Sequence, residues 1–255
     1  MSSRSSSPEN NVFSSSIIPE RENKAATTTS TDFNGLLTAP LLLHEDLKDG
    51  CGGQLWPAGM TLAKYMLAYH SGLHGKSVLE IGAGGGLVGL AVARGCHMDA
   101  SQKLLITDQI SMLSLMQKNI ALNKLESKVD ACIYDWGEPM PSEVLKAVSS
   151  SATPHPDIVL AADCVYFEPA FPLLLKTLSD IIGPNTACYF CFKKRRKADM
   201  RFIRDMMKTF CVTEVEYGDH EVDRKSSIFL YKLTMKQASR KQQPLTEQSA
   251  SFSSE

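Results

Sequence analysis

The sequence has no apolar run approaching twenty residues, and no basic segment followed by an apolar one near its start. We therefore expect neither a transmembrane helix nor a signal peptide, because a helix needs about 20 apolar residues to cross a bilayer. The sequence also lacks an excess of charge of either sign, with 27 basic and 28 acidic residues in 255. This balance argues against nonspecific binding to nucleic acid, which depends on a surplus of positive charge.

Cysteine is too scarce and too scattered to form a disulfide framework. The chain has seven Cys, an odd number, which fits a reducing compartment, and we expect the cytoplasm or the nucleus. Cys188 and Cys191 have C-x-x-C spacing, but residues three apart in a strand point to opposite faces of a sheet. His70 and His74 lie four apart, but Gly72 separates them and no acid completes a ligand set. We therefore expect no metal site.

Large apolar residues are few at both ends of the chain. Residues 1–33 are rich in Ser, Thr and Asn, and residues 236–255 are rich in Gln, Ser and Lys. Such segments bury too little apolar surface to offset the entropy of ordering, so we expect both tails to be disordered. Residues 34–235 are long enough for one α/β domain with a substantial core.

Between the tails, apolar stretches of strand length alternate with segments of helical periodicity. The predicted strands are 41–43, 77–81, 104–107, 129–134, 158–162, 186–192, 212–217 and 227–233, and the predicted helices are 57–69, 87–94, 110–123, 142–149, 169–182 and 198–209. This order predicts an α/β, Rossmann-like fold whose seven-stranded, mostly parallel sheet carries helices on both faces. A short polar loop, 218–225, joins the last two strands, so we expect a hairpin with an antiparallel last strand.

A glycine-rich segment, E-I-G-A-G-G-G, occupies residues 80–86 after the first strand of the alternating pattern. Glycine allows a tight turn and close approach to a ligand, and the following helix adds oriented N–H groups. Leu87 stands where a dinucleotide-binding motif needs its third glycine. The charge of Glu80 would repel a pyrophosphate but suits a ligand with an ammonium and a sulfonium. We infer S-adenosylmethionine (SAM), with a structural turn or another nucleotide as the alternatives.

Polar residues also follow the next strands, where ligands bind in open α/β sheets. Asp108 suits the ribose hydroxyls of an adenosine, while Asp135 and Trp136 suit the amino group and the face of adenine. Taken alone, Asp108 also fits a helix cap, and Trp136 fits an aromatic cover on the sheet edge. Asp163 lies too far upstream to cap the helix near Pro169, which favours a functional role.

These motifs together resemble the protein-lysine methyltransferases of family 16, over about residues 52–233. The motifs that carry the resemblance are W-P-A-G at 56–59, E-I-G-A-G at 80–84, Asp108, Asp135-Trp136, and the tetrad Asp163-Cys164-Val165-Tyr166 after Ala162. The resemblance implies SAM contacts at Trp56, Gly82, Ala83, Gly84, Asp108, Trp136 and Ala162, and a methyl-transfer site shaped by Asp163 and Tyr166. It also implies a protein substrate. Within the family, the chain most resembles a fungal branch that methylates translation elongation factor 1-alpha.

Positioning is the main contribution expected of such an enzyme, because the methyl group of SAM is already activated. A charged Asp163 beside a lysine amine would raise the pKa of the amine, so we expect Asp163 to orient the amine or SAM rather than accept the proton. We expect a monomer that binds neither membrane nor specific nucleic acid. A methyltransferase for small-molecule amines and a SAM-binding scaffold without catalysis are the alternative functions.

The run K-K-R-R-K at residues 193–197 follows the fifth strand of the alternating pattern. It is more basic than the family resemblance implies, which leaves the acceptor protein open. Three interpretations fit the run: docking on an acidic protein surface, a solvated helix start, and a patch for nuclear import or RNA contact.

Overall fold

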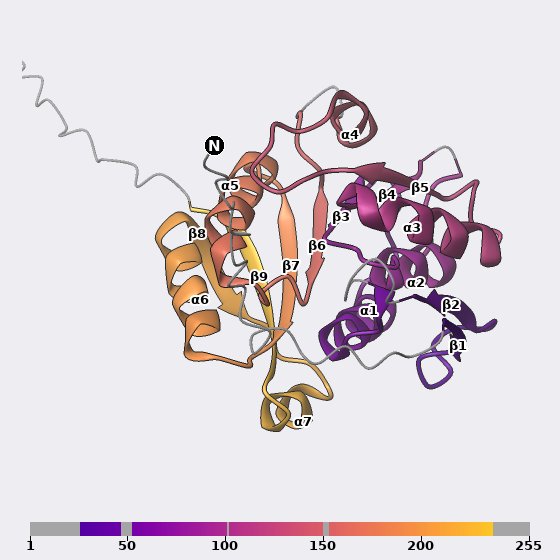
Figure 1. Ribbon diagram of the computed structural model, residues 1–255, viewed down its shortest axis with the longest axis horizontal. Helices are drawn as coiled ribbons and strands as arrows, with labels where there is room; N and C mark the ends of the chain where they lie inside the picture. The colour runs from indigo at the N-terminus through magenta and orange to yellow at the C-terminus, as the bar shows by residue number, and fades with distance from the viewer. Residues whose placement is uncertain (1–25, 47–52, 101, 150–152, 237–255) are drawn as a thin grey trace, which may run out of the picture.

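The computed structural model describes residues 26–46, 53–100, 102–149 and 153–236, and a seven-stranded sheet forms its centre (Figure 1). The strands are β3 (Val78–Ile81), β4 (Leu104–Asp108), β5 (Val129–Ile133), β6 (Ile158–Ala162), β7 (Ala187–Lys193), β8 (Phe210–Glu214) and β9 (Ile228–Met235), in the order β5-β4-β3-β6-β7-β9-β8. The first five are parallel, and β9 runs antiparallel between β7 and β8. This confirms the predicted mostly parallel sheet with an antiparallel last strand.

Helices cover both faces of this sheet. One core contains α1 (Pro57–Tyr69), α2 (Leu87–Gly95) and α3 (Ile110–Leu122), and the other contains α4 (Ser142–Val148), α5 (Phe171–Ile181) and α6 (Lys197–Thr209), with the short helix η2 (Glu168–Ala170) before α5. Cys188 lies in the core beneath α4–α6, whereas Cys191 lies in the core beneath α1–α3. Their C-x-x-C spacing therefore separates the two thiols across the sheet, as the period-two alternation of a strand predicts.

Two segments are more ordered than the sequence indicates. The strand β1 (Thr27–Thr31) pairs antiparallel with β2 (Leu41–Glu45), so the prediction of disorder up to residue 33 is wrong over these residues. Most of that tail, residues 1–25, and most of the final tail, residues 237–255, lie outside the described residues. The predicted loop 218–225 contains the helix α7 (His220–Lys225).

Contacts with α1 explain why α7 is ordered. Asp223 accepts hydrogen bonds from Thr61 Oγ1 at 3.3 Å and from the Tyr217 hydroxyl at 2.7 Å. Lys64 of α1 also pairs with Asp219, just before α7. Thr61 and Lys64 are distant from α7 in sequence, so local composition alone could not reveal the helix.

Two asparagines, Asn119 of α3 and Asn123 at its C-terminal cap, hold β2 against the main domain. Asn123 accepts from Leu42 N at 2.9 Å and donates to Leu42 O at 2.6 Å. Asn119 accepts from His44 N at 2.8 Å and donates to His44 O at 3.2 Å and to Gly85 O at 2.9 Å. The two side-chain amides thus replace the backbone of a neighbouring strand, and Asn119 also ties β2 to the glycine-rich segment.

Replacing Asn119 with Ala should lower the free energy of unfolding by about 2–4 kcal/mol, because the fully buried amide would leave backbone groups of His44 and Gly85 without partners. Urea unfolding followed by circular dichroism measures this difference. Gln117→Ala is the matched control, since Gln117 is exposed on the same helix. Equal unfolding midpoints for the two variants would contradict the role assigned to Asn119.

Candidate functional site

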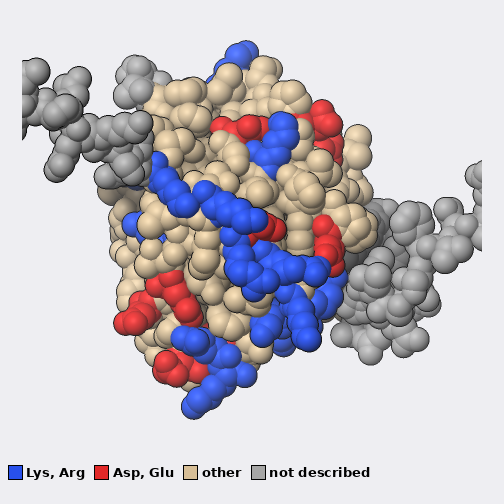
Figure 2. Space-filling model, turned by 90° about the vertical axis from the view of Figure 1, so that its left-hand side faces the viewer, with Lys and Arg blue, Asp and Glu red and all other residues tan. Residues whose placement is uncertain are grey.

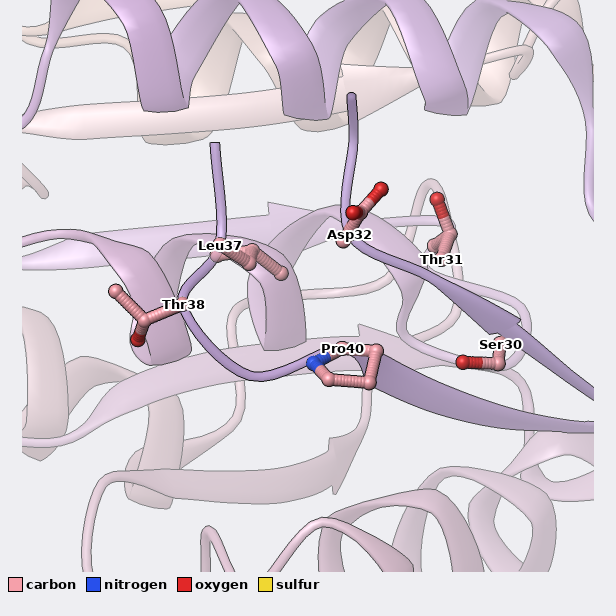
Figure 3. Close-up of a pocket in the computed structure, with 6 residues that line it drawn as sticks. All are labelled: Ser30, Thr31, Asp32, Leu37, Thr38 and Pro40. Carbon is pink, nitrogen blue, oxygen red and sulfur yellow. The ribbon is translucent and has the colours of Figure 1, made fainter. Parts of the chain in front are cut away.

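Polar or glycine-rich segments follow all five parallel strands at the carboxyl edge of the sheet. They are 82–86 after β3, Asp108 at the end of β4, Asp135-Trp136 after β5, Asp163 after β6 and 193–197 at the end of β7. A separate hollow is lined by residues of β1, the following turn and the segment that leads into β2, namely Ser30, Thr31, Asp32, Leu37, Thr38 and Pro40 (Figure 3). None of its lining residues belongs to the strand-end set, so the carboxyl edge is the candidate site.

The glycine-rich loop needs glycine for both its backbone and its packing. Gly82, Gly84 and Gly86 have φ values of +60°, +55° and +86°, in the left-handed region that favours glycine. A Cβ on Gly82 would lie 2.8 Å from the Trp136 indole and 2.9 Å from Cys164 Sγ. The predicted residues Trp136 and Gly82 are therefore brought into contact at this edge.

The backbone N–H groups of the loop are largely used inside the protein. Ala83 N donates to Thr107 O at 3.0 Å, Gly84 N to Asp108 Oδ2 at 2.7 Å, and Gly86 N to Ala83 O at 2.8 Å. The loop therefore offers a ligand close approach to its backbone rather than these three donors. This differs from the simple expectation of oriented N–H groups at a helix start.

Asp108 holds the loop and remains partly exposed at the edge. Its two carboxylate oxygens accept from Gly84 N and Gln109 N, each at 2.7 Å. Burial raises the pKa of Asp108, the two N–H donors oppose this, and the nearby Asp135 carboxylate raises it further. The Asp108 side chain does not serve as the cap of α3, whose N-terminal cap is Gln109 without a side-chain hydrogen bond. Asp108 and the exposed Asp135 thus share one edge with Trp136.

Glu80 lies beneath the loop, and its predicted contact with the ligand stays a prediction. Only 2% of Glu80 is exposed, and its Oε2 accepts from Gly89 N of α2 at 2.7 Å. Burial raises the pKa of Glu80 to about 8, with Gly89 opposing the shift and Asp108 adding to it. Through its bond with Gly89, the buried carboxyl anchors α2 under the loop.

Asp163 is the meeting point of three segments. It is 6% exposed and has a φ of +52°. Its Oδ1 accepts from Lys193 N and from Arg195 Nη1, each at 3.0 Å, and its Oδ2 accepts from Ala58 N at 3.3 Å. The carboxylate is therefore turned inward and filled with internal donors. The expectation that Asp163 orients the amine or SAM stays a prediction, and these bonds show that the carboxylate also holds the ends of β6 and β7 against α1.

Arg195 is a site residue that the sequence did not distinguish from its basic neighbours. Besides its ion pair with Asp163, its guanidinium lies 5.1 Å from the centre of the half-buried Trp56 ring. The next residue, Arg196, donates to Tyr166 O at 2.6 Å and to Asp199 Oδ1 at 3.2 Å. Two of the five consecutive cations therefore hold the strand ends together, and only tertiary structure separates them from the rest.

The remaining predicted residues border the same region. Ala162 is half-buried at the end of β6, and Tyr166 is 44% exposed in the segment that follows. No cluster of three His, Cys, Asp or Glu side chains suited to a metal ion occurs in the described part of the chain. Within the same residues, none of the helices has the length and apolar character needed to cross a membrane.

Comparisons with known proteins agree on one family. A family model described as lysine methyltransferase matches residues 37–209. The chain is 34% identical over 242 residues to protein-lysine N-methyltransferase EFM6 of Saccharomyces cerevisiae, covering 88% of this chain and 97% of that protein. It is 29% identical over 197 residues to EEF1A lysine methyltransferase 3 of Xenopus tropicalis, covering 75% and 78% of the two chains.

A solved structure shows the same fold. The 16S rRNA methyltransferase RsmC of T. thermophilus, in complex with AdoMet and guanosine, matches with a TM-score of 0.53 at 14% identity. The match covers 84% of this chain and 51% of that chain, so the present chain spans about half of its length. At this identity the likeness concerns the fold alone.

The raised pKa of Glu80 predicts a particular pH dependence. Between about pH 4.5 and 8 the folded carboxyl keeps a proton that the unfolded one loses, so ionisation of Glu80 lowers the free energy of unfolding as pH rises. Glu80→Gln removes this loss. The stability of the variant relative to the original protein should rise by up to about 1.4 kcal/mol per pH unit in that window, measured by urea unfolding. Glu126→Gln, at an exposed carboxyl, is the control. A difference independent of pH would contradict the assignment.

Removing the guanidinium of Arg195 should destabilise the protein by about 2–3 kcal/mol, because the buried Asp163 carboxylate loses its cationic partner. Thermal unfolding of Arg195→Ala measures the loss, with the exposed neighbour Lys194→Ala as control. Adding Asp163→Asn to Arg195→Ala should recover part of it, since no buried charge then remains. Strictly additive effects would show that the two side chains do not depend on each other.

Proposed function

The chain belongs to the lysine methyltransferase family, and we propose that it methylates a lysine of translation elongation factor 1A. It is a SAM-dependent protein-lysine N-methyltransferase, because the family match and the identity to named protein-lysine methyltransferases cover most of the chain. The choice of acceptor is supported by relatives that carry the name EEF1A lysine methyltransferase 3. An elongation factor as substrate favours action in the cytoplasm, and we propose a monomer.

The observation that carries the assignment of the site is the packing of Trp136 against Gly82, beside Asp108. A Cβ at Gly82 would clash with the indole, so glycine at this position lets Trp136 lie directly on the loop. Asp108 keeps lone pairs on a partly exposed carboxylate, which suits ribose hydroxyl donors. We assign Gly82, Ala83 and Gly84 to close contact with SAM, and Asp135 and Trp136 to its adenine.

Two further residues complete the proposed cofactor site. Trp56 lies under Arg195 at the start of α1, and Ala162 ends β6 next to Asp163. Asp163 follows β6 and accepts hydrogen bonds from Ala58 N of α1 and Lys193 N of β7. These bonds hold Trp56, at the start of α1, in a fixed position relative to Ala162, at the end of β6. Glu80 supports the loop from below and has no direct contact in this proposal.

The chain has to deliver a neutral lysine amine to the site. SAM, when bound, supplies a methyl group on a positively charged sulfur, which leaves as a neutral thioether when the lysine nitrogen attacks. Deprotonating a lysine with a pKa of about 10.4 at pH 7 costs roughly 4–5 kcal/mol. Tyr166 and Phe167, which are 44% and 40% exposed, offer apolar surface at the mouth that lowers the pKa of the amine by desolvation.

The proton of the amine goes to water rather than to Asp163 in this proposal. The Asp163 carboxylate already accepts three internal hydrogen bonds and is shielded from solvent. An additional proton would weaken its ion pair with Arg195. Asp163 and Tyr166 therefore act by shape and position, which agrees with a reaction whose leaving group needs no acid.

Incubation of the purified protein with labelled SAM and elongation factor 1A from cells that lack this enzyme should place label on a lysine of the factor. Mass spectrometry of the digested factor identifies the modified residue. Label found only on small molecules would favour the small-molecule amine alternative. Confirmed SAM binding without any label would favour the scaffold.

Asp108→Ala should weaken SAM binding at least about tenfold, a loss of about 1.4 kcal/mol, because the variant loses both the ribose acceptor and the bond that shapes the loop. Titration calorimetry of the folded variant measures this change. Asp130→Ala is the matched control, since Asp130 is an exposed acid on the neighbouring strand β5. Equal affinity in the two variants would remove Asp108 from the cofactor site.

A further inference from the structure

The exposed side of α6 carries a line of cations. Lys197, Arg201, Arg204 and Lys208 follow one another at spacings of four, three and four residues, which places them on one face of a helix, and all are exposed. The exposed Lys194 precedes them in the loop after β7. We call these five residues the basic stripe. Figure 2 shows that Lys and Arg side chains gather in a band across the side of the molecule that carries α6.

The charges of the basic stripe are only partly balanced. Arg201 pairs with Glu168, and Lys208 pairs with Asp205 at 2.6 Å. Over the described residues, no carboxylate lies within 4.0 Å of the side-chain nitrogens of Lys194, Lys197 or Arg204. Lys197 is the first residue of α6, where a cation is unfavourable because the N-terminal end of a helix is positive. Local helix stability therefore does not account for Lys197.

The basic stripe begins at the mouth of the proposed site. Arg196, next to Lys197, binds the backbone of Tyr166, and Arg201 pairs with Glu168, two residues after Tyr166. The two neighbours of Lys194 bind Asp163, Lys193 through its backbone N–H and Arg195 through its guanidinium. A macromolecule that presents a lysine to the site would thus lie against the first turns of α6.

We propose that the basic stripe is a docking surface for an acidic patch on the folded substrate protein, a proposal that rests on the methylation of elongation factor 1A. Unpaired surface cations attract a complementary acidic surface and raise the rate of its encounter with the site. A protein fits better than nucleic acid as the occupant, because the proposed acceptor of the methyl group is a lysine of a folded protein. Met207, 45% exposed on α6, adds the apolar contact that protein interfaces use.

The test is the charge reversal Lys197→Glu with Arg204→Glu in the full chain, assayed with elongation factor 1A and labelled SAM. Neither residue belongs to the proposed cofactor site, and Glu at the start of α6 is favourable for the helix. We expect the KM for the protein substrate to rise about tenfold or more at low salt, with the difference shrinking as salt screens the charges. The kcat and the affinity for SAM should stay unchanged.

The double variant Lys118→Glu with Lys124→Glu is the matched control, because it makes the same change in net charge at exposed positions of α3 and the turn after it. An unchanged KM in the α6 variant, while the original protein methylates the factor, would overturn the docking surface and leave the proposed function intact. Absence of methylation by the original protein would overturn both. Binding of a uridylate oligonucleotide that only the α6 reversal abolishes, with KM unchanged, would assign the basic stripe to nucleic acid.

Discussion

The buried carboxylate of Asp163 is the constraint on which the geometry of the carboxyl edge depends. A carboxylate taken out of water costs several kcal/mol unless donors and a cation compensate for the lost hydration. Here the donors come from the start of α1, the end of β7 and the Arg195 side chain. These segments lie up to 137 residues apart in the sequence, from Ala58 to Arg195, and none can move away without leaving the charge unsatisfied. The left-handed backbone at Asp163 persists because these partners hold it there.

Two other carboxylates near the glycine-rich loop have different roles because they differ in access to water. Glu80 is enclosed below the loop, where burial favours its neutral form and the bond to Gly89 supports α2. Asp108 is the last residue of β4, and its carboxylate accepts the hydrogen bond from Gly84 N that shapes the loop. This carboxylate is still partly exposed to solvent. The support of the loop and the proposed contact with the ligand are thus divided between two acids.

The sequence predicted the sheet and its helices and indicated the edge of the candidate site, because periodicity and strand ends are local features. The burial of Glu80 also had a local signal, since alternation along β3 points the residue before Ile81 toward α2. The inward turn of Asp163 had no local signal, because its donors are distant in the chain. The strand β1 was missed because its Thr-rich segment pairs with β2, which Asn119 of α3 and Asn123 at its C-terminal cap hold in turn, and these partners are distant in the chain.

The five cations of residues 193–197, from the end of β7 to the start of α6, serve both the geometry of the site and the proposed choice of substrate. Arg195 and Arg196 face inward, where they bind Asp163, Asp199 and the backbone of Tyr166. Lys194 and Lys197 face solvent and carry no such bonds among the described side chains. The outward residues can therefore change with the acidic surface of a partner at little cost to the fold. The inward arginines cannot change as freely, because each replaces water around a buried carboxylate. Substitutions of the outward residues can therefore alter which protein docks, while the carboxyl edge beneath them keeps its shape.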